Sequence, residues 1–142
     1  MNDLRRRAIG LLARREHSRA ELARKLAADG TAEDIETVLA QLEVEGLLSD
    51  ARYAEAYVRT YAGRFGAAKL RQTLRTKGID DALCNSQLAA MPDEIERARG
   101  IWARKFGTPP TDAREWARQA RFLQGRGFSA DVIRRLLKEP VE

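Results

Sequence analysis

The chain has 142 residues, of which 33% are charged and only 6% aromatic, and its net charge is +5. No apolar run approaches the length of a membrane-spanning helix, so no membrane segment is expected. The single cysteine, Cys84, excludes an internal disulfide and favours a reducing, cytoplasmic location.

Three helices are predicted in the first unit, residues 1–48. Apolar residues recur at helical spacing over 3–15, 19–29 and 32–45. Ser18 and Glu21 form a capping box at the start of the second helix, and Gly30 suits its end. Thr31 is a good N-cap for the third.

The second unit is predicted over 49–91. Leu47-Leu48-Ser49-Asp50 provides an N-cap for a helix over 50–64, and two further helices are expected over 67–77 and 80–90. Gly78 ends the middle helix. Cys84 lies on the apolar face of the third helix, where it is expected to be a small core residue.

The remaining chain is predicted to be less regular. A connecting helix over 92–106 leads to Gly107-Thr108-Pro109-Pro110-Thr111, the clearest break in the sequence. Two helices follow, over 112–125 and 130–139. We therefore expect a connecting helix and Pro-rich break over 92–111, and a shortened third repeat over 112–142.

A short motif recurs along the chain. His17-Ser18, Phe65-Gly66 and Phe128-Ser129 each look like a helix start, with Leu22, Leu70 and Ile133 placed to form a hydrophobic staple with the first residue of each pair. The first two copies lie 48 residues apart, which is within the range of helical repeats. The predicted fold is all-α, an elongated array of tandem three-helix repeats that lean on one another, with Phe65 and Phe128 mostly buried.

The sequence offers little for catalysis. His17 is the only histidine, and packing over a helix start explains it better than a catalytic role, because no serine, cysteine and acid arrangement accompanies it. The chain lacks a set of metal ligands at suitable spacing and a phosphate-binding glycine loop. We expect no enzyme activity, no cofactor and no metal.

Basic residues are unevenly distributed. Between residues 59 and 77 there are six basic residues and no acid, which favours contact with a polyanion or an acidic protein face over a solvated surface. Arg71 and Arg75, one helical turn apart, should form a ridge that Arg64 joins across the turn at Gly66. The predicted contact residues are Arg59, Arg64, Lys69, Arg71, Arg75 and Lys77, with Arg121, Arg126, Arg134 and Arg135 as a C-terminal cluster.

A helix-turn-helix transcription factor is the obvious competing interpretation. Residues 18–46 could form two helices joined at Gly30-Thr31. The second would be the recognition helix, yet it has five acids and no Lys or Arg, which suits a phosphate-lined major groove poorly.

Several motifs in order resemble the RecX family of bacterial recombination regulators. They are Ser18-Arg19-Ala20-Glu21-Leu22 with Lys25-Leu26, Leu47-Leu48-Ser49-Asp50 with Arg52-Tyr53-Ala54, the run from Lys69 to Ile79, and Arg121-Phe122-Leu123 through Arg126-Gly127-Phe128-Ser129 with Val132-Ile133. The likeness covers about residues 5–138 and is weak over 80–112. Ala67 stands where the family commonly has proline, which should slightly loosen the start of that helix.

The resemblance implies a function that the charge pattern permits. RecX proteins bind the RecA recombinase, lie along the groove of its filament on DNA, and damp its ATPase and strand-exchange activities, which affects DNA repair, recombination and the SOS response. The expected partner is the RecA filament, with possible contact to single-stranded or duplex DNA, and the protein is expected to be a monomer. The alternatives are a basic helical DNA-binding protein, acting as a repressor or architectural factor, and a protein-only adaptor.

Overall fold

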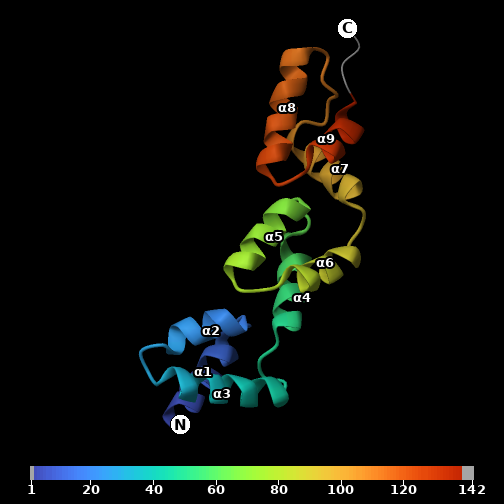
Figure 1. The fold of residues 1–142 in the computed structure, drawn as a ribbon. Coiled ribbons are helices and arrows are strands. Elements are labelled where there is room, and N and C mark those ends of the chain that lie inside the picture. Colours follow the sequence, from blue (N-terminus) through green and yellow to red (C-terminus); the bar gives the residue numbers. More distant parts are fainter. Residues whose placement is uncertain (1, 139–142) are drawn as a thin grey trace.

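The computed structural model describes residues 2–138, and over this range the regular secondary structure is all α-helix (Figure 1). No helix in this range is both long and apolar enough to cross a lipid bilayer. The helices are α1 (Asn2–Arg14), α2 (Arg19–Leu26), α3 (Ala32–Val44), α4 (Asp50–Tyr61), α5 (Ala67–Thr76), α6 (Asp81–Ala89), α7 (Glu94–Lys105), α8 (Ala113–Gly125) and α9 (Ala130–Leu137).

Local sequence explains most helix starts. At six of the described helix starts the N-cap side chain accepts a hydrogen bond from the backbone N–H three residues later. Each such bond satisfies a donor that the helix leaves unpaired and contributes about 1 kcal/mol. Ser18 does this for α2, but the side chain of Glu21 pairs with Arg15, so only the Ser18 half of the predicted capping box is observed. The other side-chain caps are Thr31, Ser49, Asp80, Asp112 and Ser129.

The helices form three bundles arranged in an elongated row (Figure 1). Helices α1–α3 enclose a core around Leu22 and Leu39, and α4–α6 enclose one around Val58 and Leu74. Helices α7–α9 enclose a third core around Leu123. Because each core is small, packing between bundles contributes to the stability of the row. The predicted all-α array of three-helix repeats is confirmed.

Helix α7 belongs to the third bundle, although the sequence suggested a connecting helix. Ala98 and Ile101 of α7 lie in the same buried cluster as Leu123 and Ile133. The break at 107–111 is therefore a loop inside this bundle, where the chain reverses between α7 and α8. The expected end of the last helix at residue 139, like residues 139–142 of the expected third repeat, lies outside the described range.

The third copy of the sequence motif also has a different place in its bundle. Ser18 and Gly66 begin the middle helices α2 and α5, whereas Ser129 begins α9, the last helix of the third bundle. By position, Ser129 corresponds to Asp80, the N-cap of α6. The motif recurs because a staple and a cap suit any helix start, so it marks helices and not a fixed place in the repeat.

The staples themselves differ in burial. Phe128 is 3% exposed and packs in the third core with Ile133, as predicted. Phe65 packs against the second core but is only partly buried. The reason is that part of its ring faces two cations, Lys69 and Arg126, instead of apolar side chains.

The two joints between bundles share one geometry. The hydroxyl of Ser18, at the start of α2, donates to the carbonyl of Lys77 at the end of α5, 2.6 Å away. The N–H of Gly66, at the start of α5, donates to the carbonyl of Arg126 at the end of α8, 2.7 Å away. The middle helices thus meet N-terminus to C-terminus along the row, an arrangement that their dipoles favour (Figure 1).

Candidate partner-binding surface

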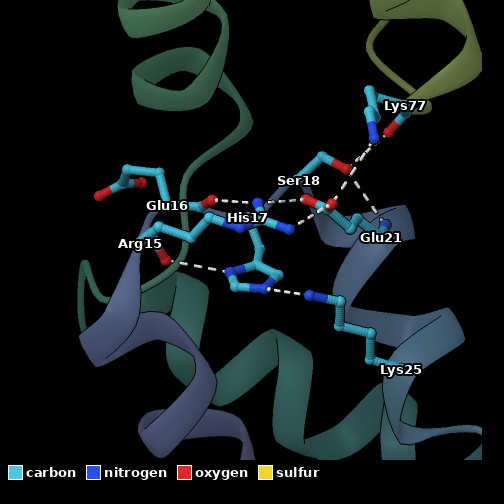
Figure 2. Close-up of polar contacts among 7 residues, drawn as sticks. All are labelled: Arg15, Glu16, His17, Ser18, Glu21, Lys25 and Lys77. Carbon is cyan, nitrogen blue, oxygen red and sulfur yellow. Dashed lines mark hydrogen bonds and ion pairs between the residues drawn. The ribbon is translucent and has the colours of Figure 1, made fainter.

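The joint between the first and second bundles holds a polar cluster (Figure 2). Lys77, one of the predicted contact residues, belongs to this cluster. Glu21 is nearly buried, and its carboxylate pairs with Arg15 at 2.9 Å and with Lys77 of the second bundle at 3.7 Å. The hydrogen bond from Arg15 lowers the pKa of Glu21 to about 2, so the carboxylate is ionised at neutral pH. Lys77 therefore links two bundles and is not available as a free cation.

His17 fills the inner side of this cluster (Figure 2). Its ring is 1% exposed, with Nδ1 3.0 Å from the carbonyl of Arg15 and Nε2 2.9 Å from Nζ of Lys25. Because a lysine ammonium can only donate, Nε2 accepts and Nδ1 carries the proton. Burial lowers the pKa of His17 below its ordinary value, which fits this neutral form and the packing role predicted from sequence.

Other predicted contact residues also pair with nearby acids. Arg59 pairs with Glu55 one turn before it on α4. Arg75 pairs with Asp81 at 2.8 Å, at the start of α6. On α9, Arg135 lies 3.6 Å from Asp131. Although these exposed pairs contribute little to stability, they reduce the positive potential that these cations present.

The ridge expected on α5 is divided in the structure. Arg71 donates to the side chain of Asn85 at 2.7 Å, and Arg75 also turns toward α6. Arg64 lies instead at the end of α4, facing the third bundle, where it lines a groove with Arg104 and Arg126. The reason for this division is that Arg71 and Arg75 turn toward α6, whereas Arg64, in the turn before α5, lies beside residues of the third bundle and does not join them.

At the second joint, Arg126 connects the two bundles through its side chain as well as its carbonyl. Its guanidinium carbon lies 5.6 Å from the ring centre of Phe65 and 5.2 Å from that of Phe122. Lys69 approaches the ring of Phe65 at 4.7 Å, and Lys105 that of Phe122 at 5.3 Å. Cations and aromatic rings therefore alternate across the joint, an arrangement that stabilises each positive charge without neutralising it.

Further hydrogen bonds fix this joint. Arg97 of α7 donates to the carbonyls of Ala62 and Phe65, each at 3.0 Å. The N–H of Ala67 donates to the carboxylate of Glu94 at 3.1 Å, a bond that a proline at this position could not form. Ala67 thus adds a contact between the second and third bundles.

A groove lies along the second joint and encloses about 580 Å³. Arg64 comes from the second bundle and the other three cations from the third, and Phe122 and Ile101 supply apolar lining. No carboxylate is among the residues described as lining it. We call this feature the junction groove; its residues are Thr60, Gly63, Arg64, Ile101, Arg104, Lys105, Phe122 and Arg126.

Sequence reasoning found only half of the cations of the junction groove. Arg64 and Arg126 were predicted, but Arg104 and Lys105 were missed, because acids in the first turn of α7 give the helix a mixed charge. The signal that could have found them is the pair of adjacent cations in the last turn of α7.

The other predicted C-terminal residues do not line the junction groove. Arg121 is exposed on α8. Arg134 borders a separate depression beside Trp116 and Ile133. Within residues 2–138, no three His, Cys, Asp or Glu side chains gather in a way that could hold a metal ion. The chemistry that the junction groove offers is the binding of an anionic group.

Comparison with known proteins covers nearly the whole chain. Three family models match in order: RecX, first three-helix domain, over residues 5–42; RecX, second three-helix domain, over 49–86; and RecX, third three-helix domain, over 92–137. The third match spans α7 to α9 and agrees with the third bundle of the structure.

Individual relatives agree with the family models. A regulatory protein RecX of Leptothrix cholodnii is 53% identical over 137 residues, covering 95% of this chain and 87% of that protein. One from Herminiimonas arsenicoxydans is 43% identical over 141 residues, covering 98% and 93%. A crystal structure of RecX from Lactobacillus salivarius has the same fold, with a TM-score of 0.84 at 24% identity and coverage of 96% and 94%.

Proposed function

The chain belongs to the RecX family, and from this premise we propose that it is a non-enzymatic regulator that binds the RecA filament and lowers its ATPase and strand-exchange activities. The relatives that match it are named regulatory proteins. The sequence resemblance that first suggested this family is therefore confirmed, and the RecA partner follows from it as part of the proposal.

The shape of the molecule supports a filament as the partner. Three bundles lie in one elongated row, and hydrogen bonds at both joints fix their order (Figure 1). A filament repeats its subunits along an axis, so a row of bundles can contact neighbouring subunits in turn. A short compact domain of the same mass could reach fewer of them.

The junction groove is the observation that carries the choice of contact surface. Arg59, Arg75, Lys77 and Arg135 pair with acids of the chain itself. The junction groove instead gathers four cations from two bundles with no acid in its described lining. We propose that this groove meets the filament.

The test is the single-stranded-DNA-dependent ATPase of RecA, measured with and without the protein. We expect strong inhibition when the protein is substoichiometric to RecA. A double reversal in the groove, R64E/K105E, should weaken the inhibition. The matched control R14E/R24E changes two exposed cations of the first bundle, with the same change in net charge, and should inhibit as the parent does. A parent protein that leaves RecA unaffected but binds duplex DNA tightly and selectively would instead be a direct DNA-binding factor.

A further inference from the structure

We propose that the junction groove binds a single-stranded phosphodiester chain whose phosphates bridge the second and third bundles. The inference rests on the proposed function, in that the groove is the working surface, and it names the ligand of that surface. It assigns the contact to nucleic acid backbone and not to an acidic face of a protein.

The composition of the junction groove favours a ligand with several negative charges. Arg64, Arg104, Lys105 and Arg126 surround a volume of about 580 Å³ whose described lining contains no acid. The lining also includes the ring of Phe122. A positively charged groove with aromatic side chains beside it is the usual arrangement for binding single strands without sequence preference.

Arg126 is held in place before any ligand arrives. The rings of Phe65 and Phe122 lie 5.6 and 5.2 Å from its guanidinium carbon, and its backbone carbonyl accepts the N–H of Gly66. A guanidinium placed between rings can still donate from its edge, and a phosphate accepts two such bonds in parallel. Because the side chain is already ordered, binding costs less conformational entropy than it would for a free arginine.

The shape of the site favours a single strand over duplex DNA and over an acidic protein segment. Recognition of duplex DNA usually places a projecting helix or strand pair in the major groove, whereas here the cations line a concave wall. An acidic protein segment would be anchored mainly by large apolar or aromatic side chains in desolvated pockets. The apolar part of this groove is limited to Ile101 and Phe122, and Ile101 is almost buried.

The ligand would also couple the two bundles. Arg64 belongs to the second bundle, and Arg104, Lys105 and Arg126 belong to the third. A chain of phosphates that contacts both sets stabilises the observed arrangement of the bundles relative to any opened one. Bound oligonucleotide should therefore raise the melting temperature of the protein as well as occupy the groove.

The experiment is direct binding in the absence of RecA. Fluorescence anisotropy of a labelled oligothymidylate is measured with the full chain over a series of salt concentrations. Each phosphate contact to a single strand contributes about −0.7 to the slope of log affinity against log salt, so four contacts predict a slope of roughly −3. R64E/K105E should weaken binding by about tenfold or more and flatten the slope, while R14E/R24E should stay within about twofold of the parent.

The milder variant R64Q/K105Q controls for the possibility that R64E/K105E loses binding only because it misfolds. It should melt near the parent temperature and bind with an intermediate loss. Equal losses in the groove and control variants would overturn the inference, because they would indicate general charge attraction. The inference would also be overturned if polyglutamate, at equal total charge, displaced the labelled oligothymidylate as well as unlabelled oligothymidylate does.

The RecA assay separates the two proposals. A groove variant that loses the oligonucleotide but still inhibits RecA leaves this inference standing and removes the groove from the proposed function. A groove variant that keeps the oligonucleotide overturns this inference, whatever it does to RecA.

Discussion

The guanidinium of Arg126 lies 5.6 Å from the ring centre of Phe65, although the two residues belong to different bundles. Replacing Arg126 by alanine removes this contact and the one to Phe122, while the backbone bond to Gly66 remains. We expect a loss of about 1–2 kcal/mol in the free energy of unfolding, measured by urea denaturation. Arg121→Ala, on the exposed face of the same helix, should stay within about 0.5 kcal/mol of the parent. Equal effects would show that the ring contacts contribute nothing.

The glycine that ends α8 should tolerate no side chain. Gly127 has φ +96°, and an added Cβ would lie 2.5 Å from Cβ of Lys69 and 2.8 Å from its backbone nitrogen. Gly127→Ala should therefore destabilise by more than the roughly 1–2 kcal/mol of the left-handed backbone alone. Gly100→Ala, in α7 with open space around it, should instead stabilise by about 0.5–1 kcal/mol. If the urea-unfolding midpoints of Gly127→Ala and Gly100→Ala move in the same direction, the special requirement for glycine at position 127 is contradicted.

The two stapling phenylalanines should differ in their contribution to stability. Phe128 is 3% exposed in the third core, so Phe128→Ala should cost about 3–5 kcal/mol through lost burial and the cavity left behind. Phe65→Ala should cost less, because its ring is only partly buried and the second core loses less buried area. Chemical denaturation of both variants checks the order, and a larger loss for Phe65 would refute it.

Mild acid should weaken the first joint through His17. Burial lowers the pKa of His17 in the folded protein below the ordinary value of 6.5, so the unfolded chain takes up the proton first as the pH falls. Stability is therefore lost as the pH drops below 6.5 toward the lowered pKa. His17→Gln cannot titrate, so its melting temperature should change less between about pH 7.5 and 5.5. Parallel melting curves for the parent and the variant would rule out this role.

Stronger acid should act on Glu21. Its pKa is about 2 in the folded protein against an ordinary 4.5, so its stabilising effect is complete above pH 4.5 and is lost as the pH falls toward 2. Glu21→Gln should be less stable than the parent at neutral pH, and the difference should shrink below pH 4.5. Glu33→Gln, at an exposed position on α3, serves as the control for unfolding free energy measured against pH. A difference that stays constant with pH would show that the Glu21 carboxylate is not the cause.

Helix positions were largely predictable because the signals are local. The capping box of Ser18 and Glu21 and the cap at Thr31 act within one turn of the chain, and the structure begins helices at both. The apolar spacing that predicted each helix is also a property of a short window. Local signals could not assign α7 to the third bundle, because that depends on Ile101 meeting Ile133 in a shared core.

The sequence by itself thus determined the helices, their order and the family, since capping, periodicity and ordered motifs are all local or linear features. Only the tertiary structure decided which cations stand together. Arg75 and Lys77 looked equivalent to Arg64 in sequence, but folding brought acids to the first two and placed Arg64 beside the third bundle. The physical reason is that the end-to-end contact of α5 and α8 carries Arg126 to Phe65, and this contact forms between segments far apart in the chain.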